Sequence, residues 1–157
     1  MSSPLELSRE ARARAPFDGG GGASAGLAPG FESVSTVFPS VPPSASGARR
    51  FVGAALQRWD IDQDVIDVAL LLASELVTNT YRHAGSDARV SVLRRPDVVR
   101  VEVHDSGEGG HVRLRPLDPA RPDGRGLNIV DALAARWGSM NSEGGTLVWF
   151  ELSTESA

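Results

Sequence analysis

The spacing of hydrophobic residues divides most of the chain into strands and helices. Residues 98–105 carry valines at positions 99, 101 and 103 with charged or polar residues between them, which predicts a strand with one buried face. Short stretches rich in β-branched residues predict four further strands, at 32–38, 88–95, 137–142 and 146–152. Hydrophobic residues three and four positions apart predict helices at 44–59, 62–83 and 127–135. The serines before Ala48 are candidate caps for the first of these helices.

The order of these segments indicates the fold class. Short turns at Arg95-Pro96-Asp97 and Glu143-Gly144-Gly145 join neighbouring strands, which favours antiparallel hairpins. Hairpins with helices placed between them predict an α+β fold, a two-layer sandwich of a mixed, mostly antiparallel sheet with helices on one face. Residues 32–38 are expected at the sheet's edge because prolines follow them closely.

The amino-acid composition predicts how the chain divides into a tail and a folded domain. Residues 1–30 are rich in Ala, Gly, Ser, Arg and Pro, which predicts a disordered tail, while residues 31–157 form a single folded domain. No apolar stretch has the length of a signal peptide or a membrane span, so neither targeting nor insertion is expected. The chain contains no cysteine, which favours a cytoplasmic location.

The kinds of basic residue and the net charge argue against two kinds of binding site. All sixteen basic residues are arginine, and a P-loop requires a lysine, so a Walker-type nucleotide site is excluded. The net charge is −4 and the arginines form no basic run, so nucleic-acid binding is not expected. The histidines at 83, 104 and 111 lack the spacing of metal ligands.

The helix at 62–83 carries a first group of candidate functional residues. At about 100° per residue, Glu75, Asn79 and Arg82 fall within about 60° of one another, at the margin of the apolar face. A carboxylate and an amide one turn apart supply a proton acceptor and a neutral oxygen ligand, as a Mg²⁺-triphosphate site requires. A solvated helix edge, with Glu75 close to Arg82, explains this helix equally well.

Asp105 is the second candidate, because it continues the apolar row of valines on its strand. A carboxylate there requires a donor, and the amino group of adenine is one that would also exclude guanine. Gly107 and Gly109 would let the backbone approach a base or ribose closely. The alternative is a strand-end aspartate that turns into the following loop.

The third candidate is Gly124-Arg125-Gly126, at the start of a predicted helix. Free amides and the positive end of the helix dipole make such a turn an anion site, although it could equally be an ordinary N-terminal cap. The preceding loop, 106–124, is long and irregular, and loops of that length in compact domains are usually functional or disordered. We expect it to act as a lid.

Three segments together resemble the N, G1 and G2 boxes of the GHKL (histidine-kinase-like) ATPase superfamily. They are Glu75-Leu76-Val77-Thr78-Asn79 with Arg82-His83-Ala84, then Val103 to Gly109, then Gly124 to Val130. The segments Phe38 to Trp59 and Gly144 to Leu152 are similar to the actinobacterial branch of anti-sigma-factor serine/threonine kinases. The resemblance covers roughly residues 32–152. Thr80 and Tyr81, where small residues are common, and the amino-terminal tail depart from it.

The resemblance implies ATP and Mg²⁺ as ligands and a role for each motif residue. Glu75 would be the catalytic base that activates the attacking hydroxyl, and Asn79 a Mg²⁺ ligand. Asp105 would hold the adenine, with support from Thr146. The remaining cofactor-binding residues in these motifs are Arg82, Gly107, Gly109, Gly124, Arg125, Gly126 and Leu127, and further candidate phosphate partners in the lid are Arg113, Arg115 and Arg121.

The resemblance also implies an activity and partners. It implies a Mg-ATP-dependent protein kinase that phosphorylates a Ser or Thr of an anti-anti-sigma (STAS-type) partner and holds a sigma factor, with a homodimer left open. The alternative is a non-catalytic ATP-binding module that sequesters a protein partner. The two differ in whether Glu75 is needed for function.

Overall fold

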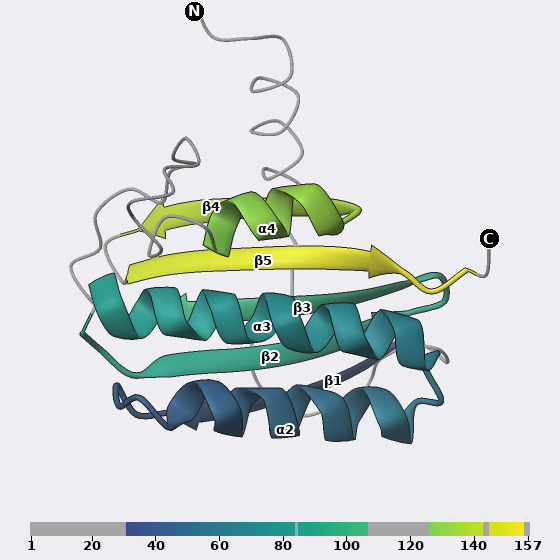
Figure 1. The fold of residues 1–157 in the computed structure, drawn as a ribbon, viewed down its shortest axis with the longest axis horizontal. Helices are drawn as coiled ribbons and strands as arrows, with labels where there is room; N and C mark the ends of the chain where they lie inside the picture. Colours follow the sequence, from purple (N-terminus) through teal and green to yellow (C-terminus); the bar gives the residue numbers. More distant parts are fainter. Residues whose placement is uncertain (1–30, 84, 107–125, 143–144, 156–157) are drawn as a thin grey trace, which may run out of the picture.

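The computed structural model describes residues 31–83, 85–106, 126–142 and 145–155. Its framework is one five-stranded sheet in the order β1-β2-β3-β5-β4, with every neighbouring pair antiparallel (Figure 1). The strands are β1 (Glu32–Phe38), β2 (Ala88–Arg95), β3 (Val98–Asp105), β4 (Arg136–Ser142) and β5 (Gly145–Ser153). The predicted edge position of β1 is confirmed, and the sheet is antiparallel throughout rather than mixed.

Three helices cover one face of this sheet. They are α2 (Ser44–Arg58), α3 (Gln63–His83) and α4 (Gly126–Leu133), and α3 lies between the other two (Figure 1). The α+β class and the two-layer arrangement with helices on one face are therefore confirmed. None of the helices in the described part of the chain is long and apolar enough to cross a membrane. The predicted tail, residues 1–30, lies outside the described residues.

The core lies between the two layers because one side of each strand is apolar. Odd-numbered residues of β3 and even-numbered residues of β5 face the helices, and the register pairs them across the sheet. α3 contributes buried residues three, four and seven positions apart, as its sequence pattern predicted. The largest fully buried side chains on this side of the sheet and on the helices are Phe150, Leu56, Leu72, Leu76, Val52, Val90, Val92, Val99, Val101, Val103 and Val130.

Close contacts fix α2 against its neighbours. A Cβ added to Gly47 would be 2.9 Å from the Phe38 ring, so the glycine lets the edge strand approach the helix. The corner after α2 is tight: Asp60 adopts φ 55°, and the amide of Ile61 donates to the carbonyl of Leu56 at 3.1 Å. This left-handed residue ends the helix and turns the chain back into α3.

Most predicted element boundaries agree with the structure to within one or two residues. The boundaries of β1, β2 and β3 are as predicted, whereas α4 ends at Leu133 rather than at residue 135. The expectation that serines cap α2 is wrong. Pro43 occupies the N-cap position without a side-chain cap, and the Ser44 hydroxyl instead donates to the carbonyl of Pro39 at 2.6 Å.

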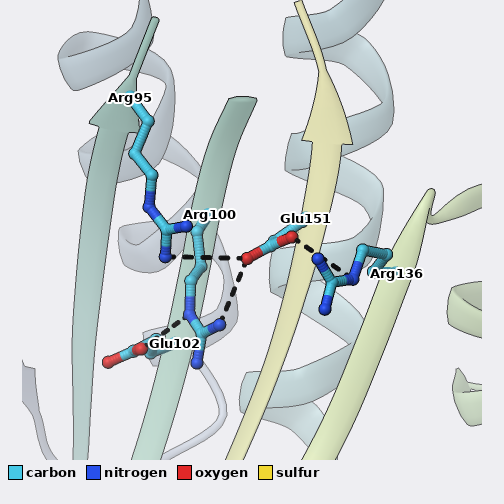
Figure 2. A network of polar contacts seen from close by, with 5 residues as sticks. All are labelled: Arg95, Arg100, Glu102, Arg136 and Glu151. Carbon is cyan, nitrogen blue, oxygen red and sulfur yellow. Dashed lines mark hydrogen bonds and ion pairs between the residues drawn. The ribbon is translucent and has the colours of Figure 1, made fainter. Parts of the chain in front are cut away.

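The outer face of the sheet, which no described helix covers, carries a network of charged residues (Figure 2). Arg100 Nε lies 2.7 Å from Glu102 Oε1, and Arg100 Nη1 lies 3.2 Å from Glu151 Oε1. Arg95 of β2 and Arg136 of β4 lie 3.9 and 3.8 Å from the carboxylate of the same Glu151. Glu151 thus joins β2, β3, β5 and β4 by electrostatic attraction.

An aromatic ring lies beneath this network. The Arg100 guanidinium stacks over the indole of Trp149 at 4.0 Å from the ring centroid, a cation–π arrangement. Arg100 and Glu151 are buried although they are charged. Burial removes water from both charges, which costs free energy. The attraction between the two charges offsets part of that cost.

We expect Glu151→Ala to lower the free energy of unfolding by about 3 kcal/mol, because it leaves the buried Arg100 with one carboxylate instead of two. The matched control is Glu32→Ala, which breaks an exposed pair with Arg94 of similar length, 3.2 Å. That pair is expected to contribute less than about 1 kcal/mol. Urea denaturation measures both, and equal losses would contradict a structural role for the buried network.

Candidate functional site

The segments that carry the candidate residues meet at one edge of the molecule. The carboxyl end of α3, the end of β3, the start of α4 and the start of β5 all lie at the left edge in Figure 1. This arrangement follows from the antiparallel topology, because β3 runs toward that edge and β5 starts from it. Segments far apart in the sequence therefore contribute to one site.

Asp105 is buried at this edge and faces the helix side of the sheet. It is 6% exposed, and in register it lies opposite Thr146 of β5, which is 3% exposed. The valines at positions 99, 101 and 103 share its side of β3 and are in the core. A carboxylate and a hydroxyl thus lie side by side where two apolar residues would be expected.

Gly145 lets β5 come close to Asp105. Its φ is +125°, which side-chain-bearing residues rarely adopt, and a Cβ added there would overlap the carbonyl oxygen of Asp105. The same Cβ would be 2.7 Å from the carbonyl carbon of Asp105 and 2.9 Å from the Cα of Ser106. Only glycine fits between the two strand ends.

Glu75 and Asn79 lie on the flank of α3 that faces away from α2. The flank next to α2 is marked by Leu70, whose Cδ2 would be 3.3 Å from a Cβ added to Gly53 of α2. At about 100° per residue, Asn79 is turned about 180° and Glu75 about 140° from Leu70. α4 lies along that opposite side (Figure 1). Both half-buried side chains therefore border the line along which α3 and α4 meet.

The other polar residues of this helix differ in exposure. Arg82 is exposed and lies within about 20° of Glu75 around the helix axis. Among the described residues, neither of them forms an ion pair. Thr80, where the resembling family commonly has a small residue, is buried. Its hydroxyl donates to the carbonyl of Leu76 at 3.1 Å, so the helix backbone satisfies this polar group. Tyr81 is partly exposed.

The motif predicted to bind phosphates is described only in part. Gly126 and Leu127 form the first residues of α4, which starts at the same edge as Asp105. The other predicted residues, in the loop and at its end, lie outside the described residues: Gly107, Gly109, Arg113, Arg115, Arg121, Gly124 and Arg125. The proposed lid and His111 lie there as well.

The groups at this edge offer several oxygen atoms to a bound molecule. Asp105 supplies an acceptor for an amino group, Thr146 a hydroxyl, Asn79 an amide oxygen and Glu75 a carboxylate. In the described part of the chain, no three His, Cys, Asp or Glu residues cluster as a metal site would require. Mg²⁺ is commonly bound through one or two protein side chains together with phosphate oxygens and waters.

Two contacts were not predicted from the sequence, one at this edge and one at the opposite end of α4. Gly145 was assigned only to a turn, although the double glycine before Thr146 was a signal of close backbone approach. Trp137, at the start of the predicted strand 137–142, packs against the core, and its Nε1 donates to Asp131 Oδ1 of α4 at 2.9 Å. No sequence pattern signals that pairing, because it depends on the angle between a helix and a strand.

This fold occurs in a family of nucleotide-binding domains. Comparison with known proteins identifies that family. The sequence profile of the histidine kinase-like ATPase domain family matches residues 38–152. The chain belongs to this family, and membership implies that it binds ATP. The predicted relationship to the GHKL superfamily is thereby confirmed.

One solved structure with the same fold contains the RsbU and RsbW domains of Rv1364c from Mycobacterium tuberculosis. The similarity has a TM-score of 0.60 at 19% identity and covers 80% of this chain. This chain spans about a third of that protein's length, since 34% of it is covered. A search of curated proteins found no significant match.

We expect Gly145→Ala to destabilise the protein by about 3 kcal/mol or more and to weaken ATP binding, because the added methyl displaces the end of β3. Gly85→Ala is the control. Gly85 also has a positive φ, +61°, but nothing lies within 4 Å of its added Cβ, so only a conformational cost of about 1 kcal/mol is expected. Thermal unfolding and ATP titration measure both effects. Similar behaviour of the two variants would show that the strand contact is unimportant.

Proposed function

We propose that this protein is a Mg-ATP-dependent serine/threonine kinase of the anti-sigma-factor type. The observation that carries the proposal is the buried pair of Asp105 and Thr146, next to the flank of α3 that bears Glu75 and Asn79. Family membership implies that the nucleotide is ATP, and the arrangement of these side chains supports a separate role for each of them.

Asp105 would bind the base. A buried carboxylate accepts hydrogen bonds and, when ionised, donates none, so it suits the exocyclic amino group of adenine and opposes the oxygen that guanine presents there. Thr146, directly opposite in register, would contribute its hydroxyl to the same polar pocket. The site would therefore discriminate between nucleotides through one side chain.

Asn79 and Glu75 would serve the phosphate end. Bound ATP would supply the phosphoryl group that is transferred, and Asn79 would give an amide oxygen to the accompanying Mg²⁺. Glu75, one helical turn earlier, would accept the proton of the attacking hydroxyl as a general base. Gly124, Arg125, Gly126 and Leu127 would hold the phosphates at the start of α4, with Arg82 as a further cationic partner.

The proposed partners are a STAS-type anti-anti-sigma protein, as phosphoacceptor, and a sigma factor. The shared fold with a protein that contains RsbU and RsbW domains supports a partner-switching role. We also propose a cytoplasmic location. A homodimer is compatible with this role.

The second candidate function is an ATP-binding module that sequesters a partner without phosphate transfer. This alternative uses the same nucleotide site and requires no general base at Glu75. The two functions differ in whether the chemistry of Glu75 is used.

We expect wild-type protein to bind Mg-ATP more tightly than Mg-GTP, and Asp105→Asn to weaken ATP binding by about tenfold to a hundredfold, since the lost hydrogen bond involves a charged acceptor. Titration calorimetry measures both. Asp97→Asn, an exposed aspartate in the β2–β3 turn, is the control and should bind as wild type does. Equal affinity for ATP and GTP would rule out Asp105 as the base-recognition residue.

We expect Glu75→Gln to reduce phosphate transfer to the partner by roughly 10²- to 10⁴-fold while ATP affinity stays nearly unchanged, because glutamine keeps the size but cannot accept the proton. Transfer from radiolabelled ATP measures the rate. Asp64→Asn, an exposed residue on the same side of α3, is the control. Wild-type transfer by Glu75→Gln would exclude the base, and no transfer by wild-type protein would favour the sequestering module.

A further inference from the structure

The direction of α4 is set by its tertiary contacts rather than by the helix itself. α4 has only eight residues, and helices that short are not stable on their own in water. Its first residue, Gly126, begins the proposed phosphate end of the site. What holds α4 against the rest of the protein therefore also decides where its free amides point.

The carboxyl end of α4 is held at two points. The amide of Ala135, in the turn after the helix, donates to the carbonyl of Glu151 on β5 at 2.9 Å. Trp137 Nε1 donates to Asp131 Oδ1 at 2.9 Å. Val130 is fully buried and Ile129 packs against the core, so apolar contacts hold the middle of α4 while these two hydrogen bonds fix its carboxyl end.

The bond between Trp137 and Asp131 connects the two layers of the fold. Trp137 lies on the helix-facing side of β4, opposite Phe150 in register, and packs against the core while half-buried. Asp131 lies in the second half of α4 and is also half-buried. A hydrogen bond from an indole to a carboxylate has a charged acceptor, which makes it stronger than a bond between neutral groups.

We propose that the Trp137–Asp131 hydrogen bond is a positioning device that aims the amino end of α4 at the phosphates of bound ATP. The inference rests on the proposed function of the α4 start as the phosphate end of the site. Eight residues span about 12 Å, so a tilt of about 5° at the anchored end moves the amino end by about 1 Å. A shift of that size is enough to misalign amides with an anion.

A merely structural role would weaken the binding of all ligands alike, and this provides the discriminating measurement. Adenosine shares the base and ribose of ATP but has no phosphates, so its affinity depends on the Asp105 end alone. Loss of the positioning bond should therefore lower the ratio of ATP affinity to adenosine affinity. Global destabilisation leaves that ratio unchanged at temperatures well below unfolding.

The test uses Trp137→Phe, which removes the N–H donor and keeps an aromatic ring. Nuclear magnetic resonance titration, which reaches millimolar affinities, measures ATP and adenosine binding to the full chain. We expect ATP to bind about tenfold more weakly and adenosine to bind within about twofold of wild type, the size expected for one charge-assisted hydrogen bond. Asp131→Ala removes the acceptor and should give the same result if Trp137→Phe does not fold.

Two further variants serve as controls. Asp131→Asn keeps an acceptor oxygen and should retain most of the affinity ratio. Trp149→Phe removes an indole N–H that finds no hydrogen-bond partner among the described residues, so it should leave the ratio unchanged.

An unchanged ratio in Trp137→Phe and Asp131→Ala, with normal ATP binding by wild type, would overturn the positioning role alone. If the affinities for ATP and adenosine fell by the same factor, the hydrogen bond would have only a structural role. That result would also overturn the positioning role. If wild-type protein binds adenosine as tightly as ATP, the proposed phosphate end is itself wrong, and the inference falls with it.

Discussion

The pairing of β3 with β5 is the constraint on which the rest of the structure depends. These strands are neighbours in the sheet although α4 and β4 lie between them in the chain. Their register sets Asp105 opposite Thr146 on the helix side and Arg100 opposite Glu151 on the outer side. A shift by one residue would exchange the two faces, burying charges in the core and exposing the valines. One register therefore fixes both the buried pair of Asp105 and Thr146 and the charged network.

The fold was largely predictable from the sequence because its elements have clear periodicity. The strict alternation of residues 98–105 and the long apolar face of residues 62–83 each allow one assignment, and both are confirmed. The prediction that serines cap α2 failed because the sequence shows which residues can cap a helix but not which acceptors lie close to them. In the structure, the Ser44 hydroxyl donates to the carbonyl of Pro39 instead.

The candidate site was predictable to a lesser degree. The row of valines placed Asp105 on the buried side of its strand, and the structure agrees. The need for glycine at 145 and the bond from Trp137 to Asp131 depend on distances between segments that are separate in sequence. Local patterns carry no such information, so these residues become visible only when the chain is folded.

The central position of β5 has a consequence for the order in which the protein becomes complete during synthesis. β5 pairs with both β3 and β4, so β4 has no strand neighbour in the described sheet until β5 has emerged from the ribosome. A nascent chain that ends before Gly145 already contains Glu75, Asn79 and Asp105, yet it lacks Thr146 and the strand that aligns them. The proposed nucleotide site would therefore be complete only after the last strand of the described sheet has been made.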